Sequence, residues 1–370
     1  MSLRAAAALS EHPLASHAVG EVTGQLLESV GRDTDLALLF VTAAHAGALE
    51  DAAGAVRELL RPRVLLGCTA ESVVGGAREV EARPAVSLWA GDVRAGAPFV
   101  LTTGDPPDVP LGAGALLLLA DPFSFPVDDL FARLAEIRPG LPIVGGMASA
   151  AHGPGGNRLV VDDAVVTEGA VGAFLGPGVE IATVVSQGCR PVGRPFVVTK
   201  SEQNIVYELA GQPALERLQE LVAVSSDDER ELMTRGLHLG LVVDEHKAEF
   251  ERGDFVVRNV MGADRQSGAI AVGAVCDVGA TVQFHVRDAA TADEDLRALV
   301  GGHDAEAALL FTCNGRGTRL FGTPDHDAGV VSDAFDGAPL AGFFCAGELG
   351  PIGGRNFLHG FTASVVLFRG

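Results

Sequence analysis

The chain has 370 residues, of which 48% are hydrophobic, and it carries a net charge of −21. This length suggests two domains, and the hydrophobic fraction is large enough for a packed core, which excludes a disordered chain. The negative charge repels nucleic-acid phosphates and anionic membrane surfaces, so we expect neither nucleic acid nor membrane as a partner.

The sequence up to residue 186 predicts alternating strands and helices. Leu14, Ala18, Val22, Leu26 and Val30 recur every four residues and predict an amphipathic helix over 14–30. Further helices are expected over 49–60 and 127–137. Compact apolar runs predict strands at Leu36–Val41, Val64–Leu66, Val86–Ala90, Phe99–Thr102, Ala115–Ala120, Pro142–Val144, Ala170–Leu175 and Val179–Ser186.

Glycines and prolines cluster after residue 186 and indicate a domain boundary over 187–203. A helical stretch interrupted at Gly211-Gln212-Pro213 is expected over 203–222, and a solvated loop or helix start over 227–231. Thr291 and Glu294 form a capping box that predicts a helix to Val300. Further strands are predicted at Leu237–Val243, Phe255–Val260, Ala269–Cys276, Thr281–Arg287, Ala308–Thr312, Pro339–Ala341 and Phe361–Phe368.

A strand–helix–strand order recurs three times with similar spacing. The second strand of each copy is expected to end at a glycine, namely Gly67, Gly145 and Gly342. We interpret the pattern as a repeated β-α-β-β unit, with independent turns of similar chemistry as the alternative. The predicted fold class is α/β, with two related halves of mixed β-sheets covered by helices, and a layered αββα arrangement fits it. The predicted division is an N-terminal helix (1–30) and two domains (31–200 and 201–370).

Five cysteines stand far apart without a CxxC pair: Cys68, Cys189, Cys276, Cys313 and Cys345. An odd, scattered set in a chain of this length is not a disulfide framework. Met1–Ser10 lacks the apolar run of a secretory signal, and the longest apolar run, Leu111–Ala120, is about half of a membrane span. We therefore expect a cytoplasmic protein with reduced thiols.

The motifs of common cofactor enzymes are absent from the sequence. There is no GxxxxGK[ST] loop, no GxGxxG after a strand, no GxSxG elbow and no HExxH pair. The histidines do not cluster as ligands, apart from Asp325-His326-Asp327, and neighbouring loop residues rarely chelate one ion together. We predict neither a cofactor nor a metal.

Polar groups follow buried strands at three places, where pockets form in α/β sheets. The first is Gly67-Cys68-Thr69-Ala70-Glu71, which could equally be a buried cysteine with a helix cap. The second is Phe311 to Gly317, which contains Cys313-Asn314-Gly315-Arg316-Gly317. The third is Gly342 to Pro351, which contains Gly347-Glu348, and His359 follows it. The guanidinium of Arg316 suits a carboxylate, and Glu348 needs a partner such as Arg316 or a ligand amine.

These segments resemble the FIST family, which has an N-terminal and a C-terminal part. The matching segments are Asp254–Asp264 (with Arg258-Asn259), Val282–Asp288, Cys313–Gly317, Gly342–Pro351 and Leu358–Thr362, with looser matches at Leu38–Val41, Gly67–Thr69 and Gly145-Gly146. The resemblance implies a FIST N-terminal-like domain over 31–200 and a FIST C-terminal-like domain over 201–370. It also implies sensing of a small ligand, with amino acids as the usual class, and a protein partner that carries the signal onward.

We therefore predict a ligand site at which Arg316, Glu348 and His359 face one pocket floored by Gly315, Gly317 and Gly347. Cys313, Asn314, Arg258 and Asn259 complete the candidate set. Arg316 and Glu348 would hold the carboxylate and the ammonium of an amino acid, and a purely structural Arg–Glu pair is the alternative. Two other functions stay open: a hydrolase that uses Cys313 or Cys345 with His359, and a protein-binding scaffold.

Overall fold

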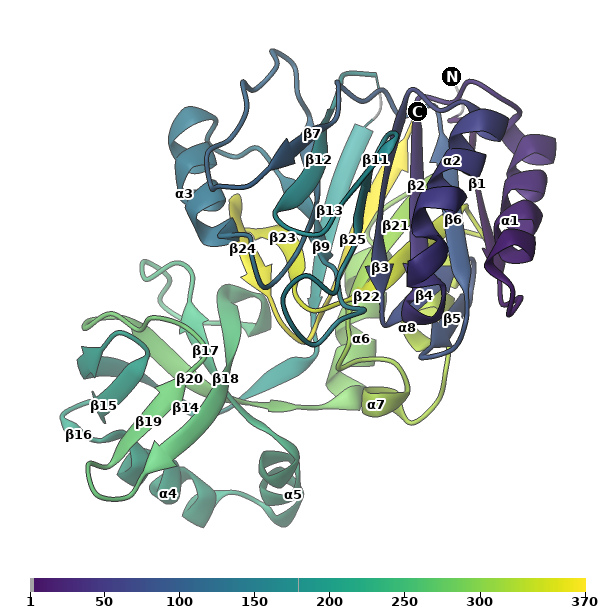
Figure 1. The fold of residues 1–370 in the computed structure, drawn as a ribbon. Helices are drawn as coiled ribbons and strands as arrows, with labels where there is room; N and C mark the ends of the chain where they lie inside the picture. Colours follow the sequence, from purple (N-terminus) through teal and green to yellow (C-terminus); the bar gives the residue numbers. More distant parts are fainter. Residues whose placement is uncertain (1–2, 179) are drawn as a thin grey trace. The chain divides into compact units, whose positions relative to one another are not determined.

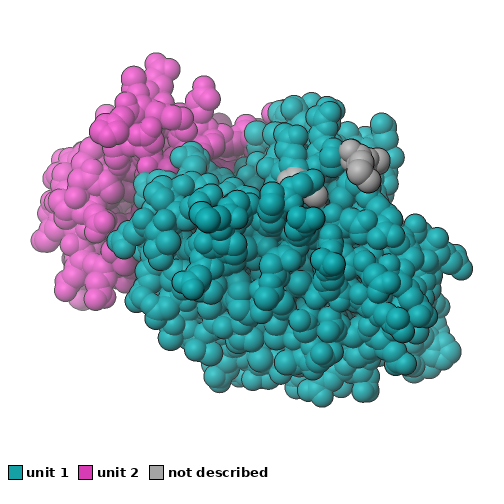
Figure 2. Space-filling model, turned by 90° about the horizontal axis from the view of Figure 1, so that it is seen from above, with its two compact units in different colours: residues 1–186, 296–358, 362–370 teal, residues 187–295, 359–361 magenta. Residues whose placement is uncertain are grey.

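The computed structural model describes residues 3–178 and 180–370 of the chain and forms two compact units (Figures 1 and 2). The larger unit comprises residues 1–186, 296–358 and 362–370, and the smaller unit comprises residues 187–295 and 359–361. The units therefore differ from the sequence halves 31–200 and 201–370, because the end of the chain belongs mainly to the larger unit. The predicted α/β class, with mixed sheets covered by helices, is confirmed.

The larger unit contains three six-stranded sheets. The first sheet has the order β1 (Ala5–Ser10), β6 (Val86–Gly91), β2 (Leu36–Thr42), β3 (Val64–Ala70), β10 (Leu159–Val161), β11 (Ala164–Val166). The second has the order β7 (Phe99–Leu101), β12 (Ala170–Leu175), β8 (Ala115–Ala120), β9 (Ile143–Met147), β23 (Glu348–Ile352), β24 (Arg355–His359). The third has the order β13 (Glu180–Gln187), β25 (Thr362–Arg369), β21 (Ala307–Cys313), β22 (Leu340–Cys345), β4 (Ser72–Gly75), β5 (Arg78–Glu81).

The three sheets share one plan. Each has a central parallel pair, namely β2–β3, β8–β9 and β21–β22. An antiparallel strand lies on one side of the pair and a two-stranded segment on the other. That two-stranded segment is always exchanged: β4–β5 follows β3 but joins the third sheet, β10–β11 follows β9 but joins the first, and β23–β24 follows β22 but joins the second. The exchange links the three sheets to one another.

Helices cover the outer faces of the sheets, and the inner faces share one apolar core. Helices α1 (Ala15–Val30) and α2 (Leu49–Leu60, preceded by the 3-10 helix η1 at Ala43–Ala48) pack on the first sheet, and α3 (Val127–Ile137) packs on the second, on the opposite side in Figure 1. Helices α6 (Ala289–Val300) and α8 (His326–Ala334) pack on the third sheet, and α7 (Thr318–Phe321) is a single turn. Any two sheets thus follow the order helix, sheet, sheet, helix.

Aromatic rings from two sheets meet in the shared core. Phe40 of β2 lies 5.0 Å from Phe343 of β22 and 6.5 Å from Phe311 of β21, measured between ring centroids. All three are fully buried, as is Trp89. Because offset and edge-to-face ring pairs are favourable, this contact holds the first and third sheets together.

Three glycines occupy the same relation to their parallel partner strands. A Cβ atom at Gly67, Gly145 or Gly342 would lie 2.3, 1.9 and 1.8 Å, respectively, from the carbonyl oxygen of the register partner, which is Leu39, Leu118 or Leu310. No side chain fits at such a distance, which explains the glycines. The prediction that each glycine ends its strand is wrong, since β3, β9 and β22 continue for two or three further residues.

The smaller unit is built around one seven-stranded sheet. Its order is β14 (Cys189–Glu202), β20 (Thr281–Arg287), β17 (Leu237–Val242), β18 (Phe255–Asp264), β19 (Ala269–Val272), β15 (Ile205–Leu209), β16 (Gln212–Pro213). Helices α4 (Ala214–Val224) and α5 (Asp227–Arg235) and the 3-10 helix η2 (Arg252–Asp254) complete it. Ser226 and Glu229 form the capping box that begins α5, so this segment is a helix.

Several predicted elements are corrected by the structure. The smaller unit begins at Gln187, within the predicted boundary region 187–203, but this region is mainly the strand β14 rather than a linker. The register of β14 with β20 shifts between Val192 and Phe196, and the bulge accommodates the glycine and proline there. Residues 203–213 form β15 and β16 rather than a helix. Helix α6 begins at Ala289, where Asp288 accepts the N–H of Thr291, so Thr291 is not its cap. Strand β13 begins at Glu180 within the predicted strand Val179–Ser186, and Val179 itself lies outside the described residues.

Candidate functional site

Arg316 follows β21 and forms a buried ion pair with Asp327 at the start of α8. Its Nε donates to Asp327 Oδ2 at 2.7 Å and its Nη2 donates to Oδ1 at 2.8 Å, and neither side chain is exposed. Burial opposes ionisation of Asp327, but the Arg316 charge and hydrogen bonds lower the pKa of that carboxyl below its usual value. The pair is therefore ionised and bidentate, and both carboxylate oxygens of Asp327 accept hydrogen bonds.

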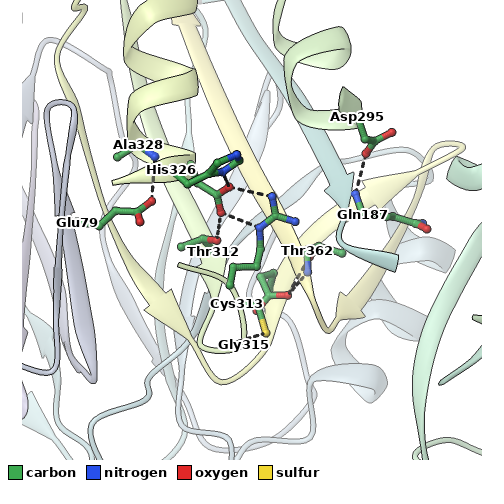
Figure 3. A network of polar contacts seen from close by, with 12 residues as sticks. Glu79, Gln187, Asp295, Thr312, Cys313, Gly315, His326, Ala328 and Thr362 are labelled. Atoms are coloured by element: carbon green, nitrogen blue, oxygen red, sulfur yellow. Dashed lines mark hydrogen bonds and ion pairs between the residues drawn. The ribbon is translucent and has the colours of Figure 1, made fainter. Parts of the chain in front are cut away.

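Further side chains complete the environment of Asp327 (Figure 3). Thr312 Oγ1 donates to Asp327 Oδ2 at 2.6 Å, and His326 Nδ1 lies 2.9 Å from Oδ1. The ring of Phe321 stacks on His326 and lies 5.2 Å from the Arg316 guanidinium carbon. These contacts fix the orientation of the pair from β21, α7 and α8.

Glu348 is a second buried carboxyl, at the start of β23. Its Oε2 accepts hydrogen bonds from Thr362 Oγ1 at 2.8 Å and from the Thr362 N–H at 3.2 Å. Burial raises its pKa to about 8, against the hydrogen bonds from Thr362 and Cys313 and the charge of Arg316. At neutral pH Glu348 is therefore mainly protonated.

Glu79 is a third buried carboxyl and lies in β5 of the third sheet. Its Oε1 accepts the N–H of Ala328 at 2.9 Å, in the first turn of α8. Burial and the nearby Asp327 charge raise its pKa to about 8. The backbone N–H of Glu79 donates to Asp325 Oδ1 at 2.6 Å. Hydrogen bonds thus connect β5 with the start of α8 in both directions.

The structure brings together some of the predicted site residues. Cys313, Arg316 and Glu348 interact electrostatically with one another. Two buried atoms here have no hydrogen-bond partner: Arg316 Nη1 and Glu348 Oε1. The ion-pair partner of Arg316 is Asp327, which the sequence presented only as part of the Asp325-His326-Asp327 tripeptide.

Asn314, Gly315 and Gly317 belong to the turn after β21, whereas Gly347 lies between β22 and β23. The Gly315 N–H donates to Cys313 Sγ at 3.4 Å, and the Asn314 N–H donates to the Cys345 carbonyl at 3.0 Å. Gly317 has φ +58, and a Cβ there would lie 2.8 Å from Glu81. The Gly347 carbonyl accepts the Met147 N–H at 2.8 Å.

The remaining predicted residues belong to the smaller unit. Arg258 and Asn259 are in β18, where Asn259 hydrogen-bonds to His238. His359 is buried at the end of β24 and is grouped with Gly360 and Phe361 in the smaller unit. The predicted site residues Arg258, Asn259 and His359 therefore do not share a compact unit with Arg316.

A cavity of about 260 Å³ lies where β2 and β3 of the first sheet end. We call it the strand-end pocket; it is lined by Thr42, Ala43, Ala44, Glu71, Ala82, Arg83, Ser149, Ala150 and His152. Sequence analysis pointed to Glu71 but missed Arg83, Ser149 and His152, which come from other parts of the chain. Only the exchange of β4–β5 and β10–β11 brings these segments to the end of the first sheet.

Two hydroxyl groups hold the walls of the strand-end pocket. Thr42 Oγ1 accepts the Ala85 N–H at 2.9 Å, and Ser149 Oγ accepts the Glu71 N–H at 2.9 Å and donates to the Phe344 carbonyl. Glu71 accepts from Arg319 Nη2 at 2.5 Å, while Arg83 lies 3.0 Å from Glu11. The pocket thus presents an acidic and two basic side chains between fixed walls.

Among residues 3–178 and 180–370, no helix is long and apolar enough to cross a membrane. Within the same described residues, no group of three or more His, Cys, Asp or Glu side chains is arranged to hold a metal ion.

Family models and similar proteins match nearly the whole chain. The model of the FIST N domain matches residues 35–212, and that of the FIST C domain matches residues 214–351. An uncharacterized protein of Mycobacterium tuberculosis strain H37Rv is 44% identical over 393 residues, covering 99% of this chain and 100% of that protein. An uncharacterized protein of Mycobacterium bovis is 45% identical over 377 residues, covering 96% of each chain. The chain belongs to the FIST family of sensory and signal-transduction domains.

Proposed function

We propose that this protein is a cytoplasmic sensor that binds a small polar ligand, with free α-amino acids as the first class to test. The observation that supports this best is the strand-end pocket, which combines the carboxylate of Glu71 with the guanidinium of Arg83 and the imidazole of His152. Ligands of α/β proteins bind at the carboxyl ends of strands, which is where this pocket lies. Its volume is below the range of drug-sized sites and suits a smaller molecule.

A zwitterion matches the charges of the pocket. Its ammonium group would replace Arg319 beside Glu71, and its carboxylate would take the place of Glu11 beside Arg83. Both existing ion pairs are partly exposed, and exposed pairs contribute little to stability, so exchanging them costs little. Because the Thr42 and Ser149 hydroxyls are already hydrogen-bonded, they would shape the pocket rather than bind the ligand.

The predicted Arg316 and Glu348 site is kept as an inner candidate. Its support is the unpartnered Arg316 Nη1 and Glu348 Oε1, since buried polar atoms ordinarily have partners. Both side chains are fully buried, so a ligand would have to open the turn after β21 to reach them. The strand-end pocket needs no such opening, and we therefore place it first.

The signal would pass to a partner protein. None of the five cysteines forms a disulfide in the part of the chain that the structure describes, which fits the reducing cytoplasm. A protein-binding scaffold and a thiol hydrolase are the competing functions, and both predict that amino acids have no effect on stability.

The test is a thermal-shift screen with the common amino acids and small carboxylates, followed by calorimetry with any ligand that raises Tm. A ligand that binds only the native state stabilises it. We expect Glu71→Gln and Arg83→Ala each to weaken binding at least about tenfold, equivalent to about 1.4 kcal/mol. Exposed Glu168→Gln and Arg265→Ala are matched controls and should bind normally.

Three outcomes would change the proposal. Binding that survives Glu71→Gln and Arg83→Ala but is lost in Glu348→Gln would move the ligand to the inner site. No stabilisation by any compound would favour the scaffold. Turnover of an ester or amide that is lost in Cys313→Ser would favour the hydrolase.

A further inference from the structure

Two thiols lie side by side at the ends of the central strands of the third sheet. Cys313 of β21 and Cys345 of β22 are register partners in a parallel pair. Side chains at paired positions point to the same face of a sheet, and the two thiols are close enough to interact electrostatically. Paired thiols on adjacent strands are the starting geometry for a disulfide.

The two thiols differ in exposure. Cys313 is half-buried, whereas Cys68, Cys189, Cys276 and Cys345 are buried. Burial raises the pKa of the Cys345 thiol well above its usual value. Cys313 accepts the Gly315 N–H at 3.4 Å, interacts with the charge of Arg316 and donates a hydrogen bond to Glu348. An oxidant would therefore meet Cys313 first, and Cys345 would react second.

We propose that Cys313 and Cys345 form an oxidative modification site for peroxides. The Cys313 thiolate attacks the peroxide O–O bond, forming a sulfenic acid and releasing water or an alcohol after protonation. The Cys345 sulfur then attacks the Cys313 sulfur, forming the S–S bond and expelling hydroxide, which leaves as water with the Cys345 proton. The two thiols lose two electrons in total, and the peroxide accepts them.

The backbone geometry permits this bond at the cost of a local movement. Neighbouring strands lie about 4.7–4.9 Å apart, within the Cα separation of about 4.4–6.8 Å that disulfides span. The Cβ atoms must approach to about 3.8 Å, so the end of β21 must move toward β22. The turn Asn314–Gly317 follows directly and carries Arg316, so oxidation would disturb the buried Arg316–Asp327 pair. The site is independent of the proposed ligand.

Cys68 is the competing partner for Cys345. It lies in β3 on the inner face of the first sheet, and its charge also influences the Cys345 thiol. It is fully buried, and burial raises its pKa well above the usual value. A bond between Cys68 and Cys345 would therefore require an oxidant to enter the core.

The test uses the full chain treated with about a tenfold excess of hydrogen peroxide, alkylated, and digested with trypsin without reduction. Cleavage after Arg297, Arg316, Arg319 and Arg355 places Cys313 in peptide 298–316 and Cys345 in peptide 320–355. We expect these two peptides to be joined, with the loss of two hydrogen atoms, and to separate on treatment with dithiothreitol.

Cysteine variants distinguish the outcomes, provided that each variant retains the circular-dichroism spectrum of the parent. Cys313→Ser should abolish the crosslink, Cys345→Ser should leave Cys313 as a sulfenic acid that dimedone traps, and Cys68→Ser should crosslink normally. A crosslink between peptides 64–78 and 320–355, or unmodified Cys313 after peroxide treatment, would overturn the proposal.

Discussion

The end of β2–β3 and the end of β21–β22 occupy the same place in two sheets of one plan, but the first borders a pocket and the second is followed by a buried ion pair. At the first, Glu71 and Arg83 line the strand-end pocket and pair with partly exposed partners. At the second, Arg316 and Asp327 are completely buried and joined by two hydrogen bonds. The comparison shows that the sheet topology places charged side chains at both strand ends. The exposure of these side chains then decides whether they can exchange an ion-pair partner for a ligand or serve only to stabilise the fold.

Removal of one buried partner should have the largest effect. Asp327→Ala leaves the Arg316 guanidinium buried without its counter-charge, and breaking a buried pair in this way costs about 3–5 kcal/mol of unfolding free energy. Urea unfolding measures the loss. A decrease below about 1 kcal/mol would mean that the pair is hydrated in solution and that the two strand ends do not differ as described.

The next largest effect on stability is expected at Gly342 in β22, the strand that pairs with β21. A Cβ at Gly342 would lie 1.8 Å from the Leu310 carbonyl oxygen, so Gly342→Ala must displace backbone and should cost about 3 kcal/mol. Gly329→Ala in α8 is the matched control, because no atom lies within 4 Å of its Cβ position. The control should be neutral or slightly stabilising by unfolding free energy; equal costs in both variants would contradict the close approach.

Much of the fold was predictable from local sequence, and the missed parts share a physical cause. Helices α2 and α3 were predicted with their observed bounds, because their apolar residues recur on one face. The segments β4–β5 and β10–β11 were missed, since they are short and each joins a sheet other than that of the preceding strand. A local pattern does not carry that information.

The same limit applies to the candidate site. The positions of Glu71, Arg316 and Glu348 after buried strands were readable from sequence, because apolar runs ended beside them. Which charge pairs with which was not readable: Arg316 pairs with Asp327, eleven residues later and across a turn and a helix start. An acidic residue at the start of the helix that follows an arginine turn is the signal that could have indicated it.

The pH dependence of stability should reveal the protonated Glu348. Its folded pKa of about 8 is raised above the ordinary value of 4.5, so the folded state binds more protons between these values. The contribution of Glu348 to the unfolding free energy is therefore fully present below pH 4.5 and is lost as pH rises toward and through 8. The loss between pH 6 and pH 8 is on the order of 2 kcal/mol. Glu348→Gln cannot titrate and should reduce the slope of this part of the curve in urea unfolding, while Glu79, whose pKa is also raised to about 8, keeps its own contribution. An unchanged slope would show that Glu348 ionises normally.

The smallest stability effect should come from the partly exposed pair at the strand-end pocket. Arg319 binds the Glu71 carboxylate and the Asn314 carbonyl, and its side chain is 57% exposed. Arg319→Ala should therefore change the unfolding free energy by less than about 1 kcal/mol, in contrast to Asp327→Ala.

If the strand-end pocket binds a ligand ammonium, Arg319→Ala also frees Glu71 from competition, so ligand affinity should rise by up to about fivefold, the equivalent of 1 kcal/mol. Calorimetry with the ligand from the screen measures this, with Arg265→Ala as the control for lost surface charge. Weaker binding in Arg319→Ala than in Arg265→Ala would mean that Arg319 itself contacts the ligand, and the exchange of partners at Glu71 would then be wrong.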